Sequence, residues 1–238
     1  MALVTGGASG IGEAIAGRLA AEGAAVHIGD VDDENAARVA SEIDAEAIHL
    51  DVTDPGSARA AVESIGTLDV LINNAGTDEF AFFTETDPDL WGRLLAVNLG
   101  GVFACTHAAL PGMQAAGYGR IVNIASEAGR VGSKGSAVYS AAKGGVIAFT
   151  KVIARENARY GITANSIAPG PIDTPLLQRA SELGELGERI VRTMADTTQM
   201  RRLGEPAEVA AAVAFLAAEE SSYVTGETLG VSGGLGMV

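Results

Sequence analysis

The segment that decides the fold runs from Ala2 to Gly23 and reads A-L-V-T-G-G-A-S-G-I-G-E-A-I-A-G-R-L-A-A-E-G. Its first residues form a short apolar strand, and Ile15 and Leu19, four residues apart, indicate a helix that ends at Gly23. A glycine-rich turn lies between the strand and the helix. This order of elements is typical of a parallel α/β sheet that holds phosphate groups at the helix N-terminus.

Three glycines in this turn have separate physical roles. Gly6 permits a tight turn, Gly10 lets a pyrophosphate approach the backbone, and Gly12 allows the helix to pack closely on the strand. Ser9 and Ile11 belong to the same phosphate-binding turn. The spacing G-x-x-x-G-x-G differs from the more familiar G-x-G-x-x-G, so the turn needs support from the rest of the chain.

An acidic residue follows the second predicted strand, residues 25–28. Asp30 lies eighteen residues beyond Gly12, where a carboxylate accepts hydrogen bonds from an adenosine ribose, and Val31 follows it. Two more aspartates come close behind, with no Arg or Lys alongside, and this charge would repel a 2′-phosphate. NAD is therefore preferred over NADP. The alternative is that Asp30 only caps the helix predicted from Asp33 to Ser41.

Three later strands also end in residues suited to a dinucleotide. Small or polar residues at a strand's carboxyl end lie against a flat ligand, and a Pro-Gly turn is rigid, although asparagines alone also indicate ordinary turns. The predicted contacts are Asp51 and Val52 after strand 47–50, Asn74, Ala75 and Gly76 after strand 68–72, and Pro169, Gly170, Ile172 and Thr174 after strand 162–168.

The strongest sign of chemistry is a tyrosine and a lysine one helical turn apart. An apolar strand at 121–124 leads to Ser126, and a helix predicted from Ser136 carries Tyr139 and Lys143 on one face. Ser126 is placed to donate a hydrogen bond to the oxygen that Tyr139 protonates or deprotonates. The alternative is a half-buried tyrosine anchor, a solvated lysine and a turn serine.

The energies set a condition on this pair. A phenol titrates near ~10, so a pKa near neutrality requires a change worth roughly 4 kcal/mol. An ammonium ~4 Å away supplies about 1 kcal/mol in water and about 4 kcal/mol at an effective dielectric near 20. Lys143 can therefore tune Tyr139 only if both are partly withdrawn from solvent.

A polar residue interrupts an apolar stripe in the helix that starts at Asp87-Pro88. Trp91, Leu94, Leu95 and Asn98 follow the i, i+3, i+4, i+7 spacing, so Asn98 is predicted to be buried. A buried amide needs partners, and it either ties two elements together or holds a water beside the active site. Two glycines directly after it loosen the helix and favour the second role slightly.

Composition limits the class of protein. The 238 residues fit one domain, 1–238, with 47% hydrophobic and 5% aromatic residues. The net charge is −14 and no basic run is longer than Arg201-Arg202, so nucleic acid is a poor candidate partner. The single cysteine, Cys105, fits a cytoplasmic protein, the three histidines lack metal-ligand spacing, and no stretch is expected to span a membrane.

A loop with Phe80, Phe82 and Phe83 offers an apolar surface to a substrate, and residues 175–200 are predicted to form a mobile helical lid over it.

Taken together, these residues resemble the short-chain dehydrogenase/reductase family over nearly the whole chain. The motifs that carry the resemblance occur in the family's order: T-G-x-x-x-G-x-G, N-N-A-G, Asn98, Ser126 with Tyr139 thirteen residues later, Y-x-x-x-K and the Pro-Gly turn. One departure is Ser232, which stands where many members have aspartate. The resemblance implies a Rossmann-type, doubly wound parallel sheet with helices on both faces, and a homotetramer joined through the Tyr139 helix and the C-terminal strand and helix.

The resemblance also implies a reaction, reversible hydride transfer between a nicotinamide and a hydroxyl or carbonyl carbon. Tyr139 looks like the general acid–base, and Lys143 like the residue that holds the nicotinamide ribose and lowers the phenol's pKa. Ser126 orients the substrate oxygen, and Asn98 retains a relay water.

Within the family, the segments N-N-A-G-T-D-E-F-A-F-F-T-E-T, I-V-N-I-A-S-E-A-G-R-V-G-S and V-S-G-G-L-G-M look most like bacterial 2-hydroxycyclohexanecarboxyl-CoA dehydrogenases. The alternatives are a 3-oxoacyl-thioester reductase or a general secondary-alcohol dehydrogenase. Acyl-carrier-protein reductases more often use NADP, against which Asp30 argues. An alternative of another class is a non-catalytic NAD-binding module.

Overall fold

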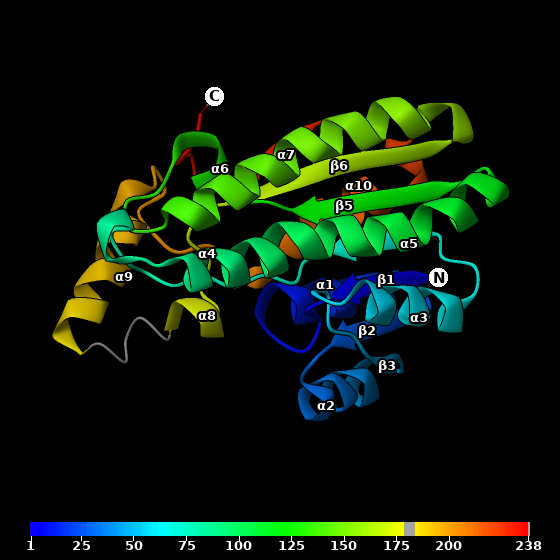
Figure 1. Cartoon of the computed structure of the whole chain (residues 1–238), viewed down its shortest axis with the longest axis horizontal. Helices are drawn as coiled ribbons and strands as arrows, with labels where there is room; N and C mark the ends of the chain where they lie inside the picture. Colours follow the sequence, from blue (N-terminus) through cyan, green and yellow to red (C-terminus); the bar gives the residue numbers. More distant parts are fainter. Residues whose placement is uncertain (179–183, 238) are drawn as a thin grey trace.

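A computed structural model describes residues 1–178 and 184–237 of the chain. Its centre is a seven-stranded parallel sheet with the strand order β3-β2-β1-β4-β5-β6-β7 (Figure 1). The strands are β1 Ala2–Thr5, β2 Val26–Asp30, β3 Glu46–His49, β4 Val70–Asn73, β5 Gly119–Ile124, β6 Ile162–Pro169 and β7 Thr228–Val231. Strands β1 to β6 lie within two residues of their predicted positions, because the buried central strands are nearly continuous apolar runs.

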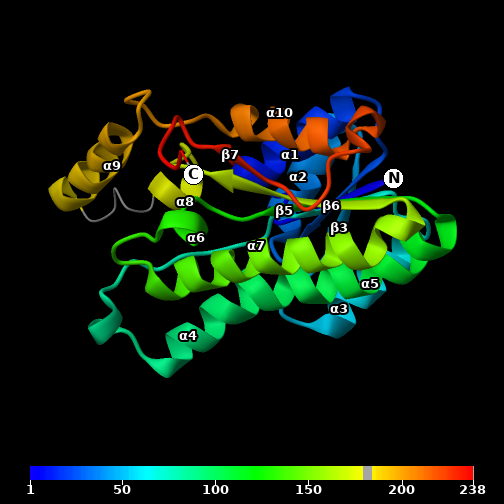
Figure 2. The ribbon, with the colours of Figure 1, turned by 90° about the horizontal axis from the view of Figure 1, so that it is seen from above.

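Helices cover both faces of the sheet, so the molecule has three layers (Figure 2). The α-helices are α1 Gly10–Ala21, α2 Asp33–Ile43, α3 Pro55–Ile65, α4 Pro88–Leu95, α5 Gly101–Ala116, α6 Ala128–Val131, α7 Ala137–Asn157, α8 Pro175–Gln178, α9 Glu185–Thr197 and α10 Pro206–Ala217. Short 3₁₀ turns are η1 Phe83–Glu85, η3 Ala158–Tyr160 and η5 Glu219–Ser221. Helices α1, α2 and α10 pack on one face, and α3, α5 and α7 on the other. The predicted doubly wound α/β fold is confirmed.

The strand order reverses between β1 and β4, which are neighbours in the sheet although two strands separate them in sequence. Chain segments leave the sheet in opposite directions at such a point and open a crevice at the carboxyl ends of the strands. The glycine-rich turn after β1 and the N-N-A-G turn after β4 both lie at this edge. The topology therefore places the predicted cofactor and catalytic residues together.

Two of the helical stretches are both long and apolar, and for them one sequence prediction was wrong. The helical stretches Pro88–Ala116 and Ala137–Tyr160 are long and apolar enough to cross a membrane by length and composition, although no such stretch was expected. In the fold, both pack on the sheet. Cys105 and Met113 of α5 and Ile153 of α7 lie in the core beneath β4, β5 and β6. Core helices of a large α/β domain meet the same criterion.

The helix that carries Asn98 departs from the regular spacing assumed for it. A π-helical turn, η2 Ala96–Gly100, separates α4 from α5. One extra residue in a turn rotates the apolar stripe. Leu94 and Asn98 are buried as predicted, but Leu95 is exposed. The two glycines after Asn98 thus accompany a bulge in a continuous helix.

A buried polar ladder crosses the middle of the sheet. Asn73 of β4 and Asn123 of β5 are register partners, and the Asn73 Nδ2 donates to Asn123 Oδ1 at 2.8 Å. Asn123 Nδ2 in turn donates to Thr150 Oγ1 of α7 at 2.9 Å, and that hydroxyl lies 2.8 Å from Ser166 Oγ of β6. Buried amides are costly unless paired, so this ladder fixes α7 against the strand ends that carry the site.

Candidate active site

The glycine-rich turn has the geometry that its sequence predicts. Gly6 has a φ of +62° and Gly10 a φ of +57°, both in the left-handed region that favours glycine. A Cβ at Gly12 would lie 2.0 Å from the carbonyl oxygen of Gly6, so only glycine fits there. The N-cap residue Ser9 makes no side-chain hydrogen bond to α1. The first amides of the helix are therefore left to an anion.

Asp30 lies at the end of β2 and is tied to this turn. Its Oδ2 accepts from the backbone N of Ala8 at 3.0 Å, and its Oδ1 accepts from the N of Asp32 at 3.1 Å. The cap of α2 is Asp32, whose side chain accepts from Asn35 N. The alternative capping role for Asp30 is therefore wrong.

A cation lies closer to this corner than the sequence suggested. The Arg38 guanidinium of α2 is 3.5 Å from the carbonyl oxygen of Ala8. It also pairs with Glu13 and Glu42, each at 3.1 Å. No Arg or Lys is next to Asp30 in the sequence, but the fold brings Arg38 close to it. Because Arg38 already has two carboxylate partners, the local charge stays negative.

The N-N-A-G turn joins the two halves of the crevice. Asn74 Nδ2 donates to the carbonyl oxygens of Thr5 and Gly6 at 3.0 and 2.9 Å, which fixes it against the glycine-rich turn. A Cβ at Gly76 would lie 2.9 Å from Asn98 Oδ1 and 3.3 Å from Lys143 Nζ. This turn therefore forms a flat wall between the phosphate-binding turn and the catalytic candidates.

Asn98 is fully buried, and its side chain pins the chain that follows this turn. Its Nδ2 donates to the carbonyl oxygens of Thr77 and Leu94 at 2.8 and 2.9 Å, and its Oδ1 accepts from Thr77 N at 3.2 Å. Of the two roles left open by the sequence, these contacts support tying two elements together.

Tyr139 and Lys143 project from the first turns of α7 toward the end of β5. Lys143 is only 3% exposed, its Nζ donates to the carbonyl oxygen of Ile124 at 2.8 Å, and it lies 5.6 Å from the centre of the Tyr139 ring. Gly129 packs against the backbone of Lys143, where a Cβ would come within 2.6 Å. Ser126 lies in the turn between β5 and α6, where its Oγ accepts from the backbone N of Ala128 at 3.1 Å and its side chain is near enough to the Tyr139 phenol to lower that pKa. The three predicted groups thus meet at one point.

Burial dominates the acid–base properties of this pair. It raises the pKa of Tyr139 to about 12, while the hydrogen bond from Ser126 lowers that pKa and the negative charge of Asp78 raises it. Burial also lowers the pKa of Lys143 to about 8, against the opposing effect of Asp78. The resemblance implies that Lys143 lowers the phenol pKa, but burial, Ser126 and Asp78 are the causes that act on Tyr139 here, and the net direction is upward.

The remaining predicted cofactor contacts differ in what their side chains touch. Thr174 lies over the glycine-rich turn, where a Cβ at Gly10 would be 3.5 Å from its side chain, and Ile172 is buried beside it. Asp51 instead binds its own loop, with Oδ1 accepting from Thr53 N and Oγ1 at 2.9 and 2.6 Å. The other members of the predicted set lie at the same edge of the sheet, at the ends of β2, β3, β4 and β6: Val31, Val52, Ala75, Pro169 and Gly170.

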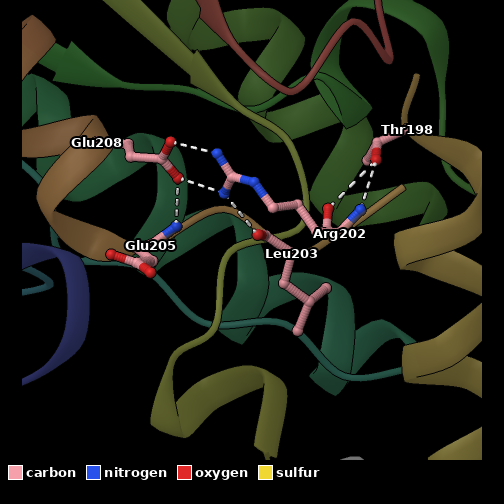
Figure 3. Close-up of polar contacts among 5 residues, drawn as sticks. All are labelled: Thr198, Arg202, Leu203, Glu205 and Glu208. Carbon is pink, nitrogen blue, oxygen red and sulfur yellow. Dashed lines mark hydrogen bonds and ion pairs between the residues drawn. The ribbon is translucent and has the colours of Figure 1, made fainter. Parts of the chain in front are cut away.

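The predicted lid contains two helices, α8 and α9, and its residues 179–183 lie outside the described residues. Its far end is fixed by a polar cluster (Figure 3). Arg202 binds Glu208 of α10 through two bonds of 2.6 and 2.7 Å, and Glu208 also accepts from Glu205 N at 2.8 Å. The Thr198 hydroxyl bridges the N and O atoms of Arg202. These bonds hold the segment between α9 and α10 against the start of α10.

Two acidic residues beside the site were missed by the sequence prediction. Glu127, directly after Ser126, is 1% exposed and pairs with Arg130 at 3.1 Å. Asp78, two residues after the N-N-A-G turn, accepts from Ser136 Oγ at 2.7 Å. In the sequence, only their positions next to predicted motifs indicated a place near the site. Acidic residues near turns are usually solvated, so their burial was not predicted.

The crevice suits a nicotinamide dinucleotide in shape and chemistry. The uncapped start of α1 offers amides to phosphates, Asp30 offers acceptors to a ribose, and Gly76 leaves room beside Lys143. Within the described part of the chain, no three His, Cys, Asp or Glu side chains gather closely enough to hold a metal ion. The residues present therefore fit a dinucleotide.

Comparison with known proteins agrees with this geometry. A family model described as enoyl-(acyl carrier protein) reductase matches residues 6–236. The chain is 41% identical to a 3-oxoacyl-(acyl-carrier-protein) reductase of Vibrio cholerae, over 100% of this chain and 98% of that protein. It is 41% identical to an acetoacetyl-CoA reductase of Shinella zoogloeoides, over 98% and 97%. The crystal structure of levodione reductase matches with a TM-score of 0.93 and 35% identity, over 98% and 96% of the chains.

Proposed function

Because the chain belongs to the short-chain dehydrogenase/reductase family, an oxidoreductase family acting on hydroxyl and ketone groups, we propose that it interconverts β-hydroxyacyl and β-oxoacyl thioesters with NAD. The observation that carries the proposal is the meeting of Tyr139, Lys143 and Ser126 beside the glycine-lined crevice. A catalytically silent NAD-binding module would not need this arrangement.

The chain's own residues have distinct tasks in this reaction. A bound nicotinamide supplies the site that gives or accepts the hydride. The phenol of Tyr139 gives a proton to the carbonyl oxygen during reduction, or its phenolate removes the hydroxyl proton during oxidation. Ser126 donates a hydrogen bond to the same oxygen, and Lys143 holds the nicotinamide ribose. Asn98 keeps the wall at Thr77 in place through its side chain, and the relay water remains a role that the family resemblance assigns to it.

The substrate class rests on two lines of support. Two relatives at 41% identity are named as reductases of 3-oxoacyl and acetoacetyl thioesters. The 2-hydroxycyclohexanecarboxyl-CoA suggested by the sequence is itself a β-hydroxyacyl thioester, so a cyclic acyl-CoA stays within the proposed class. The likeness to levodione reductase favours a second candidate, a general dehydrogenase of secondary alcohols and ketones.

The preference for NAD rests on Asp30. Its carboxylate stands at the end of β2, held by the amides of Ala8 and Asp32. A 2′-phosphate at this place would meet a fixed negative charge, and Arg38 is already paired with two glutamates. The proposal therefore separates this chain from family members that use NADP.

The proposed assembly is a homotetramer in the cytoplasm. Apolar side chains are exposed on α5, α7, α10 and the edge strand β7, where an oligomer would cover them: Phe103, Val152, Phe215 and Leu229. A single buried cysteine fits a reducing compartment.

A substrate screen tests the proposed function. Cyclic β-hydroxyacyl-CoAs, acyclic 3-hydroxyacyl thioesters and simple cyclohexanols are each offered with NAD and with NADP, and absorbance of the reduced nicotinamide is followed. We expect the highest kcat/KM for a thioester with NAD. Faster turnover of simple cyclohexanols than of every thioester would support the second candidate. An enzyme that reduces neither dinucleotide with any of these alcohols would contradict both.

A further inference from the structure

The loop after the N-N-A-G turn holds a carboxylate in a fixed place. Asp78 Oδ2 accepts from Ser136 Oγ at 2.7 Å, and its Oδ1 accepts from the backbone N of Glu79 at 2.8 Å. The loop itself is joined to the segment before α7, because Ala81 N donates to the carbonyl oxygen of Gly135 at 2.9 Å. Asp78 is therefore positioned by the same segment that starts the Tyr139 helix.

The charge of Asp78 acts on both members of the catalytic pair. It raises the pKa of Tyr139 and opposes the lowering of the Lys143 pKa. Glu79 is the other charged group acting on Asp78, and it lies on the surface in an ion pair of 3.0 Å with Arg93. Lys143 is buried and bonded to a carbonyl oxygen, whereas Asp78 is partly exposed. The partly exposed charge that acts on this pair is therefore the negative charge of Asp78.

We propose that Asp78 is a specificity-determining residue whose carboxylate, held by the Ser136 hydroxyl and by the backbone amide of residue 79 beside the start of the Tyr139 helix, excludes substrates that carry a free carboxylate next to the reacting carbonyl. Esterification removes that charge, so the site takes β-oxoacyl esters and thioesters and rejects the corresponding keto acids. Like charges about 6 Å apart at an effective dielectric of about 20 to 40 disfavour binding by roughly tenfold to a hundredfold. The inference rests on the proposed function, because it explains why the acyl group must be esterified.

The test compares one ketone in three forms: acetoacetyl-N-acetylcysteamine thioester, methyl acetoacetate and free acetoacetate. Asp78→Asn keeps an acceptor for Ser136 but removes the charge. We expect its ratio of kcat/KM for acetoacetate to kcat/KM for methyl acetoacetate to rise at least tenfold over the wild type, mainly through KM. The pH dependence of alcohol oxidation should move to lower pH, since Tyr139 loses a neighbour that raises its pKa. Neither change is expected from a purely structural role.

Glu79→Gln is the matched control, because it removes the same charge one residue away on the surface. It should leave both the ratio and the pH profile unchanged. An unchanged ratio in a folded Asp78→Asn variant, or an equal rise in Glu79→Gln, would overturn the inference. If the wild type reduces methyl acetoacetate but not the thioester, the proposed substrate class fails while the role of Asp78 is still measured on the ester and the acid. Reduction of none of the three compounds would contradict both.

Discussion

The protonation of Tyr139 sets the direction in which pH acts on the enzyme. Burial raises its pKa to about 12, so the phenol predominates near neutrality and the phenolate is scarce. Oxidation of an alcohol requires the phenolate as base, whereas reduction requires the phenol as acid. We expect kcat/KM for oxidation to rise by about tenfold per pH unit up to about pH 8, and kcat/KM for reduction to stay level through neutral pH.

Initial rates in both directions at constant ionic strength measure this prediction. Above about pH 8 the oxidation profile should flatten, because Lys143, whose pKa is lowered to about 8, loses the charge that stabilises the phenolate. Oxidation that is independent of pH from neutrality downward would show that another group is the base.

The proposed preference for NAD over NADP depends on one side chain, Asp30. Replacing Asp30 by serine removes the charge that a 2′-phosphate would meet, and leaves Arg38 nearby. We expect kcat/KM with NADP to rise at least tenfold relative to that with NAD. The control Asp44→Asn removes the same charge at the far end of α2, where Asp44 has a φ of +54° that asparagine tolerates. If Asp30→Ser left the ratio unchanged, Asp30 would not select the cofactor.

Helix α1 gives a matched pair of substitutions within one element. Alanine at Gly12 would place a Cβ 2.0 Å from the Gly6 carbonyl oxygen, whereas nothing lies within 4 Å of a Cβ at Gly17. Gly12→Ala should therefore distort the turn and abolish dinucleotide binding. Gly17→Ala should stabilise the fold by about 0.5–1 kcal/mol, because alanine favours a helix. Isothermal titration with NAD and thermal unfolding measure both, and normal NAD binding by Gly12→Ala would refute the role of the turn.

The elements were largely predictable from sequence, and the exceptions have physical causes. The α4 cap was correct, since Asp87 accepts from Leu90 N, and each predicted strand appears. Leu95 is exposed although its spacing from Trp91 predicted burial, and it is the last residue of α4, directly before a π-helical turn that the sequence did not predict. The sequence offered Asp30 as an alternative N-cap of α2, but the structure shows Asp32, two residues later, in that position.

In the candidate site, local motifs were easier to predict than long-range contacts. Tyr139, Lys143 and Ser126 share one short stretch, and the structure brings them together. The bond between Asp78 and Ser136 joins residues 58 apart, and the Arg38 contact with Ala8 joins residues 30 apart. Neither follows from spacing, because both depend on how separate loops meet at the sheet edge.

At the scale of the whole molecule, the exposed apolar surface predicts self-association. Phe103 of α5 packs on Phe149 of α7 with ring centres 4.6 Å apart, and Val152 beside them is 49% exposed. Light scattering should give a multiple of the 24.1 kDa chain mass, near four times. Val152→Glu should lower that mass, because it buries a charge in the contact. The control Ala21→Glu lies on the exposed face of α1 and should not. A monomeric wild type would contradict the predicted assembly.

The central claim is that Tyr139 transfers the proton that accompanies hydride transfer. The direct test is the rate of NAD reduction with the best β-hydroxyacyl thioester, in the wild type and in Tyr139→Phe, with Tyr160→Phe as a control at a tyrosine that bonds Arg159 on the surface. We expect Tyr139→Phe to lose about 10²–10⁴-fold in kcat with unchanged NAD affinity, and Tyr160→Phe to lose none. Full turnover by Tyr139→Phe would contradict the account.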